Sequence, residues 1–160
     1  MDPLVIVLRF VHVVFGALWV GMVAFVTFFL MPALQAAGPE GGKVMAAVNR
    51  RGFMTALPIL AIGALISGFW LYYIVGAGDP AAFGRSPRGM TLALGGLAAL
   101  IAWVVGMAVV RPSMLKAMQL DEQKDLEEIR RLRVRGFKAS KALTHLLLFA
   151  LAAMAVARYL

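Results

Sequence analysis

The stretch LVIVLRFVHVVFGALWVGMVAFVTFFLMP, residues 4–32, decides the fold class of this chain. It is longer than the ~20 apolar residues that a helix needs to cross a ~30 Å hydrocarbon core. Three more apolar runs follow at about residues 53–76, 90–111 and 140–158. None of them alternates with the period of a barrel strand, and a helix satisfies its own backbone polar groups in lipid. The sequence therefore predicts an all-α integral membrane protein, a bundle of four spanning helices.

The overall composition also indicates a membrane protein. Of the 160 residues, 62% are hydrophobic, and the mean hydropathy is +0.85, whereas soluble domains are nearer half apolar. Cysteine is absent, which excludes a disulfide framework and a thiolate metal site. The net charge of +8 comes from basic residues between the apolar runs, a distribution that argues against a nucleic-acid partner. We expect a single transmembrane domain over residues 1–160, with the lipid bilayer as its partner.

The charges of the three linkers predict the orientation. Linkers 33–52 and 112–139 hold most of the basic residues, whereas linker 77–89 holds two arginines. The positive-inside rule places the two basic linkers in the cytoplasm and both termini outside. The aromatic stretch GFWLYY, residues 68–73, suits the outer interface. We expect a multi-pass protein of a bacterial-type inner (plasma) membrane, with a cytoplasmic helical linker over about 113–138 that continues the third or fourth span.

The two halves of the chain resemble each other, which suggests two repeated helical hairpins. FLMPAL at 29–34 matches VVRPSML at 109–115, and RRGFMTALPIL at 50–60 matches RVRGFKASKAL at 133–143. Such repeats are related by an axis along the membrane normal. The alternative is that any inner membrane edge favours arginine before an apolar run, and that helices often stop at proline.

His12, Gly16 and Trp19 form the strongest candidate site in the sequence. Their spacing of four and three places them on one helix face. The glycine leaves room beside the imidazole and the tryptophan supplies a flat wall, so the face suits a macrocycle or a quinone. An ionisable residue inside a span is a functional hypothesis, yet a neutral imidazole bonded to a neighbouring helix explains it equally well.

His145 is the second candidate ligand, because it is the only other histidine in the chain. It is expected near the cytoplasmic end of its span, where a structural role is also open. From the helical rise, His12 and His145 should differ in depth by about 8 Å or more. Ligation of one haem iron by both histidines would therefore be strained, whereas one histidine alone, or one completed by a methionine, would not.

Copper is an alternative cofactor, because thioethers suit Cu(I). The chain has ten methionines, and Met114 and Met118 are spaced to share a helix face. Methionine is also an ordinary apolar filler. The motifs of soluble catalytic sites, such as HExxH, GxSxG and a glycine-rich phosphate loop, are missing. No acidic residue lies inside a predicted span, which argues against a carboxylate-driven ion pump.

The stretch LRFVHVVFGALWVG, residues 8–21, resembles the first-helix signature of HemJ-type protoporphyrinogen oxidases and CopD-type copper-resistance membrane proteins. Residues 50–73 are similar to the second HemJ-type helix, with its basic start, central proline and Gly-x-Trp-Leu end. The resemblance implies a b-type haem protein or haem-pathway enzyme with His12 as a haem ligand. The HemJ-type oxidases also have a lysine in the third helix, and this chain lacks it, because residues 89–110 contain no lysine.

We therefore expect an inner-membrane haem b protein linked to electron transfer or tetrapyrrole oxidation. Its cofactor would be held by His12, Gly16, Trp19 and His145, with the two histidines as iron ligands. A copper-handling or transport protein and a cofactor-free structural subunit of a larger membrane complex remain the alternatives. Whether the chain is an enzyme, and whether it forms a homo-oligomer or pairs with a partner subunit, stays open.

Overall fold

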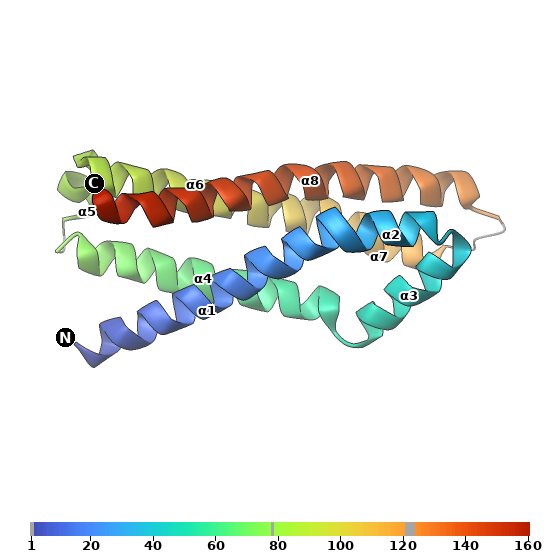
Figure 1. Cartoon of the computed structure of the whole chain (residues 1–160), viewed down its shortest axis with the longest axis horizontal. Helices are drawn as coiled ribbons and strands as arrows, with labels where there is room; N and C mark the ends of the chain where they lie inside the picture. The colour runs from blue at the N-terminus through green and yellow to red at the C-terminus, as the bar shows by residue number, and fades with distance from the viewer. Residues whose placement is uncertain (1, 78, 121–123) are drawn as a thin grey trace.

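A computed structural model of the chain describes residues 2–77, 79–120 and 124–160 and shows a bundle of long helices (Figure 1). Those residues contain no β-strand, so the predicted all-α four-helix fold is confirmed. The elements are α1 Pro3–Phe25, the π-helix η1 Val26–Leu30, α2 Met31–Ala36, α3 Pro39–Arg50, α4 Phe53–Val75, α5 Pro80–Arg85, α6 Pro87–Val105, the π-helix η2 Gly106–Val110, α7 Arg111–Gln119, α8 Leu126–Val156 and the 3-10 turn η3 Ala157–Tyr159.

Four continuous helical stretches are long and apolar enough to cross a membrane: Pro3–Ala36, Phe53–Val75, Pro87–Gln119 and Leu126–Tyr159. The third and fourth extend well beyond the predicted spans. The basic segment over about 113–138, which was expected to form a cytoplasmic helix that continues the third or fourth span, is divided between the two. Residues up to 119 prolong the third stretch, and residues from 126 belong to α8. Positions 121–123 of that predicted helix lie outside the described residues.

Two π-helical turns let the first and third helices continue through a proline. A proline ring clashes with the carbonyl four residues earlier and removes one hydrogen bond. Just before Pro32 and Pro112 the helix widens, and the N–H groups of Met31 and Arg111 bond to the carbonyls of Val26 and Gly106. The expected helix end at Pro32 is therefore wrong. The two π turns have the same offset from their prolines, which supports the internal repeat.

The repeat breaks down at its two Arg-Gly-Phe sequences. Gly52 has φ 85° and begins α4, so it serves as a turn residue that only glycine adopts without strain. Gly136 instead lies inside α8. A Cβ there would lie 2.7 Å from Cε of Met114, so this glycine permits close packing of α8 against α7.

The helices associate as two pairs, α1 with α4 and α6 with α8, which contact each other less than the helices within each pair. Both termini lie at one end of the bundle, and α3 and α7 lie at the other (Figure 1). Small residues allow the close approach that membrane helices need in order to pack. A Cβ at Gly95, for example, would lie 3.2 Å from the Cβ of Ala153. In the first pair, the ring of Phe15 fills the notch at Gly63.

Candidate functional site

The half-buried His12 packs against α4 in a fixed orientation. Its Nδ1 lies 2.9 Å from the carbonyl oxygen of Ala64. Because a carbonyl only accepts, Nδ1 donates a hydrogen bond to it, and in the neutral imidazole Nε2 then keeps its lone pair. A Cβ at Gly68 would lie 2.7 Å from Cε1 of the ring, so glycine is required for the imidazole to lie here. Two residues of α4, Ala64 and Gly68, thus fix the orientation of the His12 ring, and Nε2 is the nitrogen that remains available as a ligand.

The other two residues of the predicted cleft face different surroundings. A Cβ on Gly16 would meet no atom within 4 Å. No side chain or backbone of the described residues therefore packs into the space that this glycine leaves. Trp19 is only 6% exposed and lines an internal cavity to which His12 and Gly16 do not contribute. Although their helical spacing places the three residues on one face, only Trp19 lines the cavity.

His145 lies on the exposed side of α8, away from His12. Its Nδ1 is 2.7 Å from the carbonyl oxygen of Lys141, and its ring meets that of Phe28 edge to face, with the centroids 6.1 Å apart. Phe28 follows His12 along one continuous helical stretch, at an axial distance of about 24 Å. The two histidines are therefore too far apart to ligate one iron, as the depth argument anticipated.

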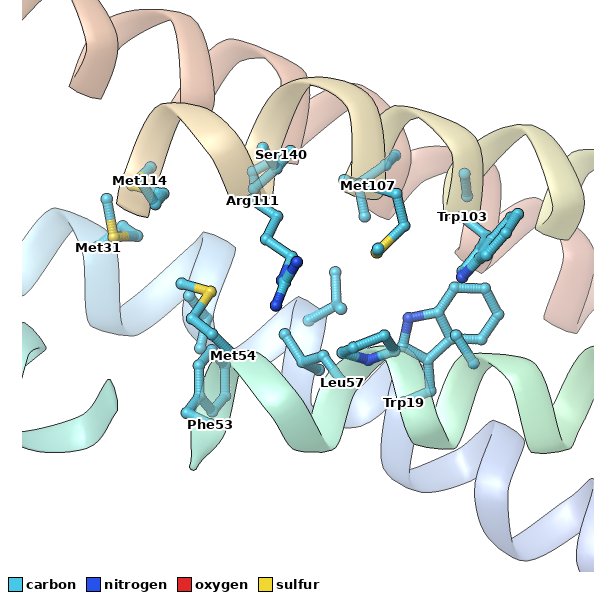
Figure 2. Close-up of a pocket in the computed structure, with 18 of the residues that line it drawn as sticks. Trp19, Met31, Phe53, Met54, Leu57, Trp103, Met107, Arg111, Met114 and Ser140 are labelled. Carbon is cyan, nitrogen blue, oxygen red and sulfur yellow. The ribbon is translucent and has the colours of Figure 1, made fainter. Parts of the chain in front are cut away.

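A cavity of about 90 Å³ lies between the two helix pairs. It is next to the end of the bundle that carries α3 and α7, and it draws its lining from both halves of the chain (Figure 2). Binding sites of repeated membrane folds commonly form where the repeats meet. Its large lining side chains include two tryptophans, five methionines and one arginine: Trp19, Trp103, Met31, Met45, Met54, Met107, Met114 and Arg111.

Two buried donors of this cavity lack a partner. Nε of Arg111 and Nε1 of Trp103 have no hydrogen-bond acceptor among the described residues. Figure 2 shows the guanidinium of Arg111 reaching down from α7 into the cavity, toward Met54 and Leu57. The lining residues that the structure describes include no carboxylate. Buried polar groups in proteins are nearly always hydrogen-bonded, so this pair of donors marks the cavity as a candidate site.

This cavity was not predicted from the sequence, although the spacing of three of its lining residues could have indicated part of it. Trp103, Met107 and Arg111 follow one another at intervals of four and so share a helix face. Most of the other lining residues come from α1, η1, α2, α3, α4 and α8, and the periodicity of one segment cannot predict that these elements meet.

Three buried hydroxyls tie the first helical stretch to α8 beside the cavity. Oγ1 of Thr27 lies 2.7 Å from Oγ of Ser140 and 3.0 Å from Oγ1 of Thr144. The hydroxyl of Thr144 also donates to the carbonyl oxygen of Ser140 at 2.7 Å. Ser140 lines the cavity as well, so this network fixes one of its walls.

Among the described residues, the side chains that could bind a metal ion are methionine thioethers and single histidine imidazoles. Those residues contain no group of three or more His, Cys, Asp or Glu side chains that could hold a metal ion. The predicted pair Met114 and Met118 is split, because Met114 is buried while Met118 is exposed. Met114 instead packs in a buried cluster with Met31, Met45 and Met54, a thioether set suited to Cu(I).

Comparisons of the chain with protein-family models, curated proteins and solved structures give no match. The similarity to the HemJ-type and CopD-type proteins therefore rests on the motifs of the first two helices.

Proposed function

We propose that the chain is an inner-membrane haem b protein, linked to electron transfer or tetrapyrrole oxidation, in which His12 is an axial ligand. The hydrogen bond between Nδ1 of His12 and the carbonyl of Ala64 carries the proposal. Metal-binding histidines almost always donate their other N–H to a carbonyl, carboxylate or water, and this bond fixes the tautomer and the ring orientation. His12 has such a partner, and its Nε2 has the lone pair that a metal needs.

The packing of His12 against α4 supports a haem with one protein ligand. Gly68 provides the notch for the ring, and its missing Cβ keeps the imidazole close to α4. Haem b would supply the one-electron chemistry of iron, with a potential set by the axial ligand and by burial. His145 is left out of the site, because its distance from His12 prevents shared ligation. In the orientation that we propose, both termini lie outside and His12 belongs to the outer half of the membrane.

The absorption spectrum of the detergent-purified protein, recorded after reconstitution with hemin, tests this proposal. Reconstitution is needed because an expression host can underload haem. We expect a Soret band in the unmodified protein that is lost in His12→Ala and retained in the matched control His145→Ala. A colourless protein after reconstitution, or an unchanged Soret band in His12→Ala, would overturn the assignment.

A copper-handling protein is the second candidate, and the buried methionine cluster favours it. Met31, Met45, Met54 and Met114 come from four helices and meet beside the cavity. Metal analysis of the colourless protein after exposure to Cu(I) tests this candidate. Stoichiometric copper that is lost in Met54→Leu and Met114→Leu would support it. A protein without haem or copper would leave the structural-subunit alternative, in which His12 only joins α1 to α4.

A further inference from the structure

We propose that the cavity between the two helix pairs binds an anionic amphiphile. Its carboxylate or phosphate headgroup would lie at Arg111, and its apolar chain would lie along Trp19 and Trp103. His12 does not line this cavity, so the inference is independent of the haem proposal.

The first argument is charge. The guanidinium of Arg111 stays ionised at any physiological pH, and it makes no ion pair or hydrogen bond with another described residue. Among the described residues, no acidic side chain lines the cavity. Charged groups among membrane helices are costly and nearly always pair with something. An anion from outside the chain would supply the missing partner.

The second argument is the kind of hydrogen bond that is missing. Nε of Arg111 and Nε1 of Trp103 are both donors, and neither has an acceptor. Arginine and tryptophan side chains cannot accept hydrogen bonds. The hydroxyl of Ser140, the other polar side chain of the lining, already bonds to Thr27. A ligand that only accepts, such as a carboxylate or phosphate oxygen, therefore suits the cavity better than water, which also needs acceptors for its own hydrogens.

The third argument is depth. Residues 89–110, between Arg88 and Arg111, contain no charged side chain, and as a helix they span about 33 Å. That length matches the hydrocarbon core, so Arg111 lies at the membrane boundary where lipid headgroups lie. Helix side chains incline toward the N-terminal end of their helix, which here is toward the bilayer centre. Basic pockets between helices at this level are typical sites for lipid headgroups.

The size of the cavity limits how the ligand enters. A volume of about 90 Å³ equals the share of roughly three water molecules in the liquid. It accepts a headgroup and the first part of a chain, whereas the rest of the chain must leave between the two helix pairs. This boundary has fewer contacts than the interface within either pair. The ligand is therefore expected to enter sideways from the membrane.

Fluorescence quenching by brominated lipids tests the proposal, because two of the three tryptophans line the cavity. The third, Trp70, is 52% exposed and is removed as Trp70→Phe. In this background we expect saturable quenching by dibromostearate and only a small, non-saturable effect of its uncharged methyl ester. The apparent affinity should fall at least tenfold in Arg111→Gln, fall less in Arg111→Lys, and stay unchanged in the control Arg88→Gln.

Two further arms identify the source of the headgroup and guard against a misfolded variant. In nanodiscs, stronger quenching by dibrominated phosphatidylglycerol than by dibrominated phosphatidylcholine assigns the site to a membrane phospholipid, whereas quenching by the free acid alone assigns it to a fatty acid. If Arg111→Gln does not fold, oleate must still reverse the quenching in the Trp70→Phe protein and oleyl alcohol must not. Equal effects of charged and uncharged ligands would overturn the proposal and leave water as the occupant.

Discussion

Replacing Thr27 by valine should destabilise the bundle measurably, because it removes the hydroxyl at the centre of the buried network. Thr27 is 1% exposed, and valine keeps its shape but not its hydroxyl. Thr144 retains its bond to the carbonyl of Ser140, so the hydroxyl of Ser140 is the group left without a partner. Hydrogen bonds between membrane helices contribute about 0.6 kcal/mol on average and about 1.7 at most. We expect a loss of about 1 kcal/mol, or roughly a fivefold change in the unfolding equilibrium.

The measurement is an unfolding titration with dodecyl sulfate in mixed micelles, followed by far-ultraviolet circular dichroism. Thr55→Val is the matched control, because Thr55 is exposed at the start of α4, and it should change stability by less than about 0.5 kcal/mol. In a double-mutant cycle, Thr27→Val and Ser140→Ala should be non-additive by about 0.5 kcal/mol or more. Equal losses in Thr27→Val and Thr55→Val, or simple additivity, would refute the role given to this network.

The same titration checks two more contacts. Gly63→Ala should cost about 1–3 kcal/mol through overpacking, because its Cβ would occupy the place of the Phe15 ring. The control Gly21→Ala has open space and should be neutral or slightly stabilising; equal losses in both variants would contradict this packing. Glu128→Gln breaks the 2.6 Å ion pair with Lys116, which is about half exposed. It should cost less than about 1 kcal/mol, and the loss should vanish in high salt. A loss that persists in high salt would argue against an exposed pair.

The number of spans and the helical fold could be predicted from the sequence because they depend on apolar length alone. The helix ends were harder. Pro32 and Pro112 were expected near helix ends, but a π turn before each one accommodates the proline ring without ending the helix. The closeness of α1 and α4 was partly predictable, because Gly63 and Gly68 are small residues on one helix. Their partners, Phe15 and His12, depend on the crossing of the helices and could not be predicted.

The candidate site could be predicted only where a single residue was unusual in its sequence context. His12 stood out as an imidazole in an apolar run, and the structure gives it a specific partner on α4. The cleft expected from its spacing to Gly16 and Trp19 does not coincide with the cavity, which Trp19 lines and the other two do not. Helical spacing fixes a face but not the neighbour that each residue meets. Arg111 looked like one more basic residue at a linker edge. Only the structure shows that Arg111 lines a cavity and that its Nε has no hydrogen-bond acceptor among the described residues.

The charge of Arg111 also decides between the two ligands that the same cavity suggests. Met54 and Arg111 both line the cavity, and the guanidinium reaches toward Met54 (Figure 2), so a Cu(I) ion held by this thioether would lie close to a positive charge. Two like unit charges about 8 Å apart repel by roughly 2 kcal/mol at an effective dielectric constant of about 20, whereas an anion gains a similar amount. Arg111→Gln should therefore strengthen Cu(I) binding if the thioethers form a copper site, and weaken anion binding if the cavity holds a headgroup. The opposite signs mean that one substitution distinguishes the two ligands. The guanidinium of Arg111, which has no partner among the described residues, favours the anion.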